Sequence, residues 1–190
     1  VSYCLFGSKK HLMNELFENK SYPFYKFGDA IYLQKIGTQD WVEYICNRFS
    51  VTGKQISEQL AERICQAVDN HSSYVQQLAW LVWIHTDKIA TEKDFESAYQ
   101  DIIDQNTPLF EKQTESLTTY QMNFLRAVLD GVHSEFTKQE ILNKYQLGTS
   151  ANISIVKRAL EKKELIEKEK RKIIIPDPIM SVWLKRELGM

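Results

Sequence analysis

The stretch that decides the fold of the C-terminal part runs from residue 137 to residue 175, TKQEILNKYQLGTSANISIVKRALEKKELIEKEKRKIII. Apolar residues recur at helical spacing over 137–145 and again over 151–163, and a Leu-Gly pair lies between the two segments. A charged turn around Lys170 and Arg171 then separates two strand-like segments, 165–169 and 172–175. The pattern predicts a helix–turn–helix followed by a β-hairpin.

One more helix is expected before this stretch. Over 119–129, Phe124, Leu125 and Val128 fall on one helical face, and Gly131 ends the pattern. Three helices followed by a hairpin is the element order of a winged helix, in which the second and third helices form the helix–turn–helix. We therefore assign residues 117–190 to a winged-helix domain with a small β-hairpin.

Residues 37–116 predict a compact helical bundle. Four short amphipathic segments follow one another here, and each begins at a residue that can cap a helix. These residues are Thr38, Ser57, Ser72 or Ser73, and Thr91. The Asn-Thr-Pro sequence at 106–108 is expected to break or kink the fourth helix, because proline cannot donate to the helical hydrogen-bond ladder. Four consecutive short helices imply a bundle.

The first 36 residues have the pattern of an α/β domain. Residues 1–6 form a short apolar run, 10–17 an amphipathic segment and 30–36 an alternating one, which predicts strand, helix and strand. A chain that opens on such a run indicates either a processed N-terminus or, the interpretation we favour, the C-terminal piece of a longer protein. Isolated strands expose their edges, so self-association through residues 1–36 is expected.

The charge of the chain is divided between its two parts. Residues 1–116 hold 11 Lys and Arg against 16 Asp and Glu, whereas residues 117–190 hold 13 against 9. The formal net charge of −1 is therefore the sum of an acidic N-terminal part and a basic C-terminal part. Such asymmetry suggests two domains, the basic one being a candidate for binding nucleic acid or an acidic partner. An ordinary solvated surface is the alternative reading.

The cysteines and the apolar runs restrict the class of protein. The three cysteines are odd in number and have no CxxC spacing, which argues against a disulfide scaffold or a zinc site and for a cytoplasmic protein. No apolar run reaches the length of about 18–20 residues of a membrane span, so no membrane association is expected. The histidines are scattered, so no metal site is predicted.

Four short motifs occur in a characteristic order along the chain. They are Leu-Phe-Gly-Ser at 5–8, Pro-Phe-Tyr at 23–25, NHSSYVQQL at 70–78 and DPIMSVWL at 177–184. Their order and spacing resemble the C-terminal half of the archaeal-type ATPases, a branch of the AAA+/STAND P-loop superfamily. The resemblance spans nearly all 190 residues, although the family's Gly and Pro in the third motif are replaced by Asn70 and Ser72.

The resemblance implies a mainly α chain with the remnant of an α/β P-loop core. Residues 1–36 would end the nucleotide-binding core, 37–116 would form a helical lid, and 117–190 the winged helix. Lid and winged helix would couple the nucleotide state to a partner protein or to DNA. The parent protein would bind ATP and Mg, but no GxxxxGK[ST] motif and no acidic Walker-B strand occur here. The chain alone is therefore not expected to hydrolyse ATP, and it has no predicted catalytic residue or cofactor.

The resemblance also assigns three nucleotide-facing positions. Ser8 stands at the sensor-1 position, and His71 and Tyr74 would face the nucleotide from the lid. The simpler alternatives are a turn or cap residue for Ser8 and a capped helix start with a packed tyrosine for His71 and Tyr74. Trp80 and Trp83, three positions apart, are more typical of the bundle core, or of an interface between lid and nucleotide-binding core, than of a ligand site.

The basic segment of the winged helix supplies candidate nucleic-acid contacts. Eight cations stand against four anions between residues 157 and 172. Cations would contact phosphates, and Asn152 and Ser154 in the first helical turn would reach base edges. The predicted contacts are Asn152, Lys157, Arg158, Lys170, Arg171 and Lys172. Two alternatives stay open: a winged helix that contacts protein, and a stand-alone winged-helix DNA-binding transcriptional regulator.

Overall fold

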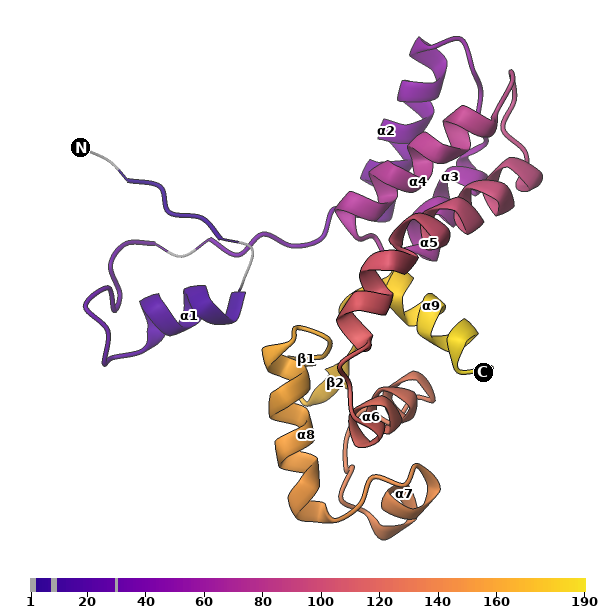
Figure 1. The fold of residues 1–190 in the computed structure, drawn as a ribbon. Coiled ribbons are helices and arrows are strands. Elements are labelled where there is room, and N and C mark those ends of the chain that lie inside the picture. Colours follow the sequence, from indigo (N-terminus) through magenta and orange to yellow (C-terminus); the bar gives the residue numbers. More distant parts are fainter. Residues whose placement is uncertain (1–2, 8–9, 30) are drawn as a thin grey trace. The chain divides into compact units, whose positions relative to one another are not determined.

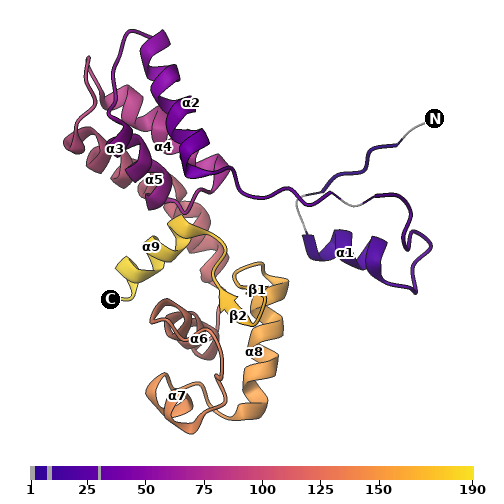
Figure 2. The same cartoon turned by 180° about the vertical axis from the view of Figure 1, so that it is seen from behind.

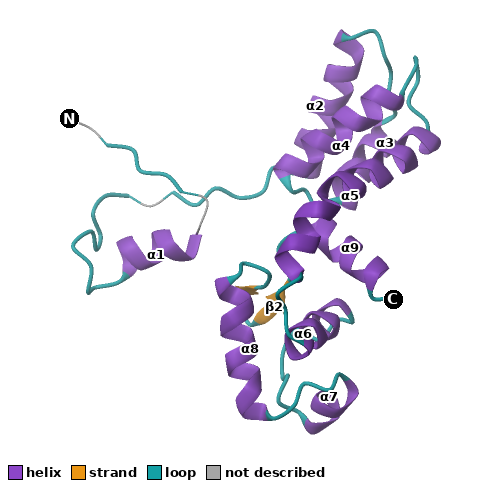
Figure 3. Ribbon diagram, viewed as in Figure 1, coloured by secondary structure: helices purple, strands orange, loops and turns teal. Residues whose placement is uncertain are grey.

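The computed structural model describes residues 3–7, 10–29 and 31–190, which belong to two units, Val1–Gln34 and Lys35–Met190 (Figure 1). The described residues are mainly helical and contain one two-stranded sheet, which confirms the predicted fold class (Figure 3). None of the described helices is both long and apolar enough to cross a membrane.

The first unit contains the helix α1 (Lys10–Glu18), which confirms the helix predicted there. The two strands predicted on either side of it are wrong for the residues that the structure describes, 3–6 and 31–36, because neither segment pairs with another strand. A strand exists only through a hydrogen-bonded neighbour. Phe6 and Leu33 are 93% and 91% exposed. Residues 1, 2, 8, 9 and 30 lie outside the described residues.

The second unit opens with four helices, as the sequence predicts. They are α2 (Thr38–Val51), α3 (Glu58–Ala67), α4 (Ser72–His85) and α5 (Glu92–Thr114). Thr91 and Asp94 form a reciprocal capping box at the start of α5, and Ser57 caps α3. The N-cap positions of α2 and α4 are held instead by Gly37 and His71, neither of which makes a side-chain cap bond.

Helix α5 continues through Pro108, so of the predicted break or kink, the break is wrong. Proline withdraws one backbone donor and weakens the preceding turn. The carbonyl that loses its donor is that of Asp104. Two side chains bond to neighbouring carbonyls: Asn106 Nδ2 donates to the carbonyl of Ile102 at 2.7 Å, and Thr107 Oγ1 donates to that of Ile103 at 3.0 Å. Packing from buried residues on both sides of the proline then keeps the helix whole.

The winged-helix element order is also present. It comprises α6 (Thr119–Leu129), α7 (Gln139–Lys144), α8 (Ser150–Lys162), β1 (Glu167–Glu169) and β2 (Lys172–Ile174). The strands are antiparallel, with Glu167 opposite Ile174, and the turn between them places Lys170 at φ 55°. The backbone N–H of Ile173 donates to the carbonyl of His133 at 2.8 Å, so the hairpin is tied to the loop before α7.

A last helix, α9 (Pro178–Glu187), returns to the bundle and was not predicted from the sequence. Pro178 occupies its first turn, where a missing N–H costs nothing. In both views α9 lies beside α5 (Figures 1 and 2). The rings of Phe110 and Trp183 are 5.7 Å apart, and Arg186 pairs with Asp104 at 3.2 Å. Bundle and winged helix therefore share one hydrophobic core.

This shared core predicts a large effect of truncating Phe110, which is fully buried. Phe110→Ala should lower the free energy of unfolding by about 3–5 kcal/mol, because the ring leaves a cavity against Trp183. Leu109→Ala is the matched control, since Leu109 is exposed on the same turn. Urea denaturation measures both. Equal, small losses for the two variants would contradict a core that runs from α5 into α9.

Candidate functional site

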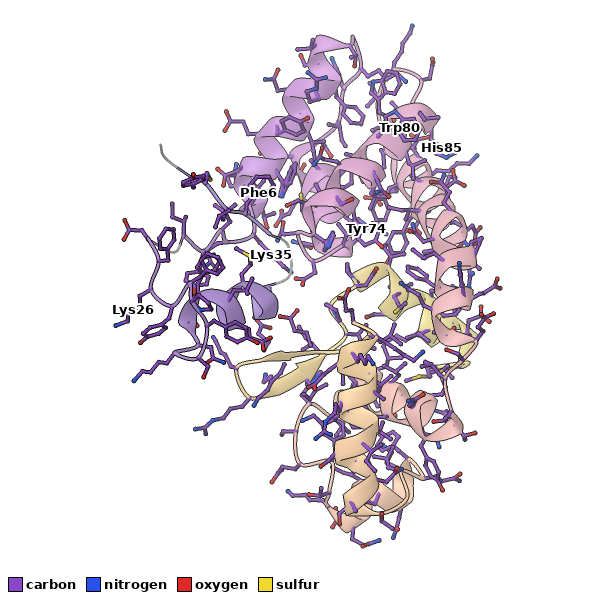
Figure 4. All side chains as sticks on the ribbon, turned by 60° about the vertical axis from the view of Figure 1, so that its left-hand side comes forward. Phe6, Lys26, Lys35, Tyr74, Trp80 and His85 are labelled. Atoms are coloured by element: carbon purple, nitrogen blue, oxygen red, sulfur yellow. The ribbon has the colours of Figure 1, made fainter. Side chains whose placement is uncertain are left out.

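The start of α4 is bonded directly to the winged helix. The hydroxyl of Tyr74 donates to Asp177 Oδ2 at 2.8 Å, across 103 positions of sequence. Tyr74 is buried, and its ring lies 4.9 Å from that of His71. Figure 4 shows Tyr74 at the end of α4 that lies close to α9. The two lid residues selected from the sequence therefore come together at the junction between bundle and winged helix.

Asp177 has two structural roles through its two carboxylate oxygens. Oδ1 accepts from the backbone N–H groups of Ile179 and Met180, both at 2.9 Å, and so caps α9. Oδ2 accepts from Tyr74. One side chain therefore starts the last helix and fastens it to α4. The sequence analysis noted the Asp-Pro pair without assigning this role.

The surroundings of Tyr74 keep its hydroxyl group protonated, so that it remains a hydrogen-bond donor. Burial, followed by the hydrogen bond to Asp177 and its negative charge, raises the pKa of the Tyr74 hydroxyl far above its ordinary value of 10.0. Beside it, Nδ1 of His71 is buried and has no hydrogen-bond partner among the described residues. The site therefore combines a satisfied tyrosine with an unused imidazole nitrogen.

A tight turn positions these residues. Asp69 and Asn70 take φ values of 49° and 52°, in the left-handed region that asparagine tolerates better than most residues. Nδ2 of Asn70 donates to Thr38 Oγ1 at 3.0 Å, which ties the turn to α2. Asn70 thus holds a backbone conformation that glycine also adopts.

Ser8, the third nucleotide-facing position, lies outside the described residues. The structure therefore brings together His71 and Tyr74 only. In the part of the chain that the structure describes, no group of three or more His, Cys, Asp or Glu side chains could hold a metal ion.

The basic surface of the winged helix is formed by α8 and the hairpin. Arg158 is exposed and Lys157 half-buried on α8, and Lys170, Arg171 and Lys172 are exposed at the hairpin. None of these five cations forms an ion pair with another described residue. Their charge is therefore free to meet an anionic partner.

Asn152 differs from the other predicted contacts. Its Nδ2 donates to the carbonyl of Leu147 at 3.2 Å, and Gly148 at φ 79° packs closely beside it. The amide thus secures the turn of the helix–turn–helix. Ser154, Ile155 and Arg158 are the side chains that α8 exposes nearby. An exposed isoleucine suits the methyl group of thymine, a contact that a search for polar residues overlooks.

Trp80, labelled in Figure 4, lies outside the bundle core, the first of its two expected locations. It is 57% exposed, whereas Trp83 is half-buried. Nε1 of Trp83 donates to Thr52 Oγ1 at 2.9 Å. The two indoles therefore line the surface between α2 and α4.

Comparison with known proteins supports the winged helix and the overall fold. Residues 108–186 match the model of a family described as a probable winged helix domain. The whole structure is similar to that of a Walker-type ATPase of Pyrococcus abyssi, with a TM-score of 0.68 and 16% sequence identity. The alignment covers 94% of this chain and 51% of that protein, so this chain spans about half its length. No curated protein sequence matches the chain. The chain thus carries a winged helix on a fold shared with half of an ATPase.

Removal of the Tyr74 hydroxyl tests the junction. Tyr74→Phe should lower the free energy of unfolding by about 1.5–3 kcal/mol, because the hydrogen bond it removes has a charged acceptor. Tyr120→Phe, at an exposed tyrosine of α6, should have almost no effect. Urea denaturation followed by circular dichroism provides both values. A loss no larger than that of the control would show that Asp177 does not depend on Tyr74.

The contribution of the Tyr74–Asp177 hydrogen bond to the free energy of unfolding should fall at high pH. An unfolded tyrosine ionises near pH 10.0, whereas Tyr74 in the folded chain keeps its proton to higher pH. The native state then binds more protons above pH 10, so the stabilisation is present below that pH and declines as pH rises further. The stability difference between the wild type and Tyr74→Phe should stay constant from about pH 7 to 9 and shrink above 10. A constant difference up to pH 11 would contradict a raised pKa.

Proposed function

We propose that this chain is the C-terminal part of a cytoplasmic AAA+/STAND-type ATPase, in which a lid and a winged helix couple the nucleotide state to DNA or a partner protein. The likeness to a Walker-type ATPase supports this proposal, since 94% of the chain aligns and spans only half of that protein. The other half would supply the P-loop and Walker-B residues that hold ATP and Mg. Residues 1–36 would complete that nucleotide-binding core, 37–116 form the lid, and 117–190 the winged helix.

The observation that carries the coupling is the bond between Tyr74 and Asp177. The resemblance places His71 and Tyr74 toward the nucleotide, at the start of α4. Tyr74 also bonds to the cap of α9, and α9 packs against α5. A nucleotide that moves the start of α4 would therefore act on Asp177 directly. In the parent protein, hydrolysis would shift the lid and the winged helix with it, and Ser8 would sense the γ-phosphate.

The output surface in this proposal is α8 with the hairpin. Its unpaired cations, Arg158 and Lys170–Lys172, suit phosphate groups, and Ser154 and Ile155 would approach base edges. The same basic surface favours the second candidate, a stand-alone DNA-binding regulator. Only the first candidate requires a bound nucleotide, so nucleotide binding distinguishes the two.

The exposed apolar residues of the first unit fit the parent protein as well. Phe6 and Leu33 are almost fully exposed, as expected of segments that lack the neighbouring strands of a nucleotide-binding core. In the 190-residue chain they should instead promote self-association through residues 1–36. Light scattering at rising protein concentration would reveal it.

The first test is the gene sequence upstream of Val1. A P-loop and an acidic Walker-B strand are expected within about 150 residues, roughly one domain. The complete protein should then bind ATP in the presence of Mg, and replacement of the P-loop lysine by alanine should abolish binding. A start codon directly before Val1, or a complete protein that binds no nucleotide, would overturn the ATPase and leave the regulator.

The second test measures DNA binding by the 190-residue chain with a fluorescein-labelled duplex. Affinity should fall as salt rises, and Lys170→Ala and Arg171→Ala should each lower the slope of log K against log salt by about 1. Lys185→Ala, at an exposed cation on α9, is the control. Absence of binding at low salt would assign the winged helix to a protein partner.

A further inference from the structure

A groove lined by aromatic residues lies between α2 and α4, away from the Tyr74–Asp177 junction and from the basic surface. Its volume is about 360 Å³, and its walls include Trp41, Tyr44, Phe49, Trp80 and Trp83. Tyr44 and Trp80 are 48% and 57% exposed, although aromatic side chains of this size are usually buried. The bundle core does not account for them, because it is closed beneath by residues such as Ile45 and Val75.

One end of the groove is held in a fixed conformation. Trp83 is anchored by its bond to Thr52, and the ammonium group of Lys54 lies 4.1 Å from the centre of its ring. Lys54 Nζ also donates to the carbonyls of Trp83 and Thr86, at 2.6 and 2.5 Å. A preformed aromatic surface binds at a lower entropic cost than a mobile one. These contacts therefore suit the groove to a partner.

The lining residues of the groove include one positive charge and no negative charge. Trp41 is only 5% exposed, and its Nε1–H has no hydrogen-bond partner among the described residues. Arg48 lines the groove and forms no ion pair with a described residue, and no carboxylate is among the lining residues. Thr52, by contrast, already accepts from Trp83 and donates to the carbonyl of Phe49. Arg48 is therefore the one charged side chain among the lining residues, and charge complementarity selects an acidic occupant.

The length of the groove favours a helix. Its wall on α2 runs from Trp41 to Thr52 with helical periodicity, which is about 16 Å at 1.5 Å per residue. The wall on α4 runs from Val75 to Trp83. Walls of two to three turns match the apolar face of a helix of about 10–12 residues, whose anchors recur at i, i+3 or i+4, and i+7.

We propose that this groove binds an amphipathic helix of a partner protein, with apolar anchors against Trp80 and Tyr44 and an acidic side chain at Arg48. Trp80 is the central anchor point because it is large and exposed, and Arg48 sets the charge preference. The inference does not rest on the proposed ATPase, since neither the nucleotide nor the winged helix takes part.

Two synthetic probes test it: a fluorescein-labelled 12-residue helical peptide with leucine anchors and glutamates on its polar rim, and the same peptide with lysines in their place. Fluorescence anisotropy with the 190-residue chain should show that the glutamate peptide binds at least about tenfold more tightly. Trp80→Ala should weaken it about tenfold, and Arg48→Glu should reverse the preference toward the lysine peptide. Arg126→Glu, an exposed charge reversal on α6, should change neither affinity.

Three outcomes would overturn the proposal. They are equal binding of both peptides, binding that Trp80→Ala and Arg48→Glu leave unchanged, and a dimer of the chain itself that Trp80→Ala dissociates. The third would assign the groove to a second copy. Because Trp80 and Arg48 are exposed, both variants should fold, and circular dichroism verifies this. A failure here leaves the nucleotide and DNA tests untouched.

Discussion

The contact of α9 with the bundle is the constraint on which the second unit depends. A winged helix alone is small, with few fully buried side chains, and small domains bury too little surface to be very stable. Here its last helix leaves the hairpin and packs Trp183 against Phe110, while Asp177 fastens its first turn to Tyr74. The interior of the winged helix therefore continues into that of the bundle, and neither module has a separate core.

Local sequence signals predicted most of the elements in this unit. The capping box at Thr91, the periodicity of 151–163 and the charged turn at Lys170 and Arg171 all act within a few residues, so a single sequence contains them. The predictions failed where contacts with residues distant in the sequence determine the secondary structure. The strands of the first unit need neighbours that the described residues lack, and α5 continues through Pro108 because buried side chains pack on both sides of it.

The candidate site also has features that local sequence predicts and features that depend on distant residues. Resemblance identified His71 and Tyr74, and composition identified the cations of α8 and the hairpin. The partner of Tyr74, however, stands 103 residues away, and no local pattern predicts that pairing. The hydrogen bond of Asn152 to the turn and the exposure of Trp80 also follow from which helix packs where, and helical periodicity alone does not predict them.

The unbroken α5 has a consequence for how the two modules communicate. The segment that matches the winged helix family begins at residue 108, inside this helix, so the border between the modules lies within one helix, at the proline that removes one of its backbone hydrogen bonds. No loop separates the modules at that border. The last turns of α5 therefore belong to both modules, because Phe110 on this helix packs against Trp183 of the last helix. A recombinant winged helix cut at residue 117 would lose Phe110 and leave Trp183 facing water.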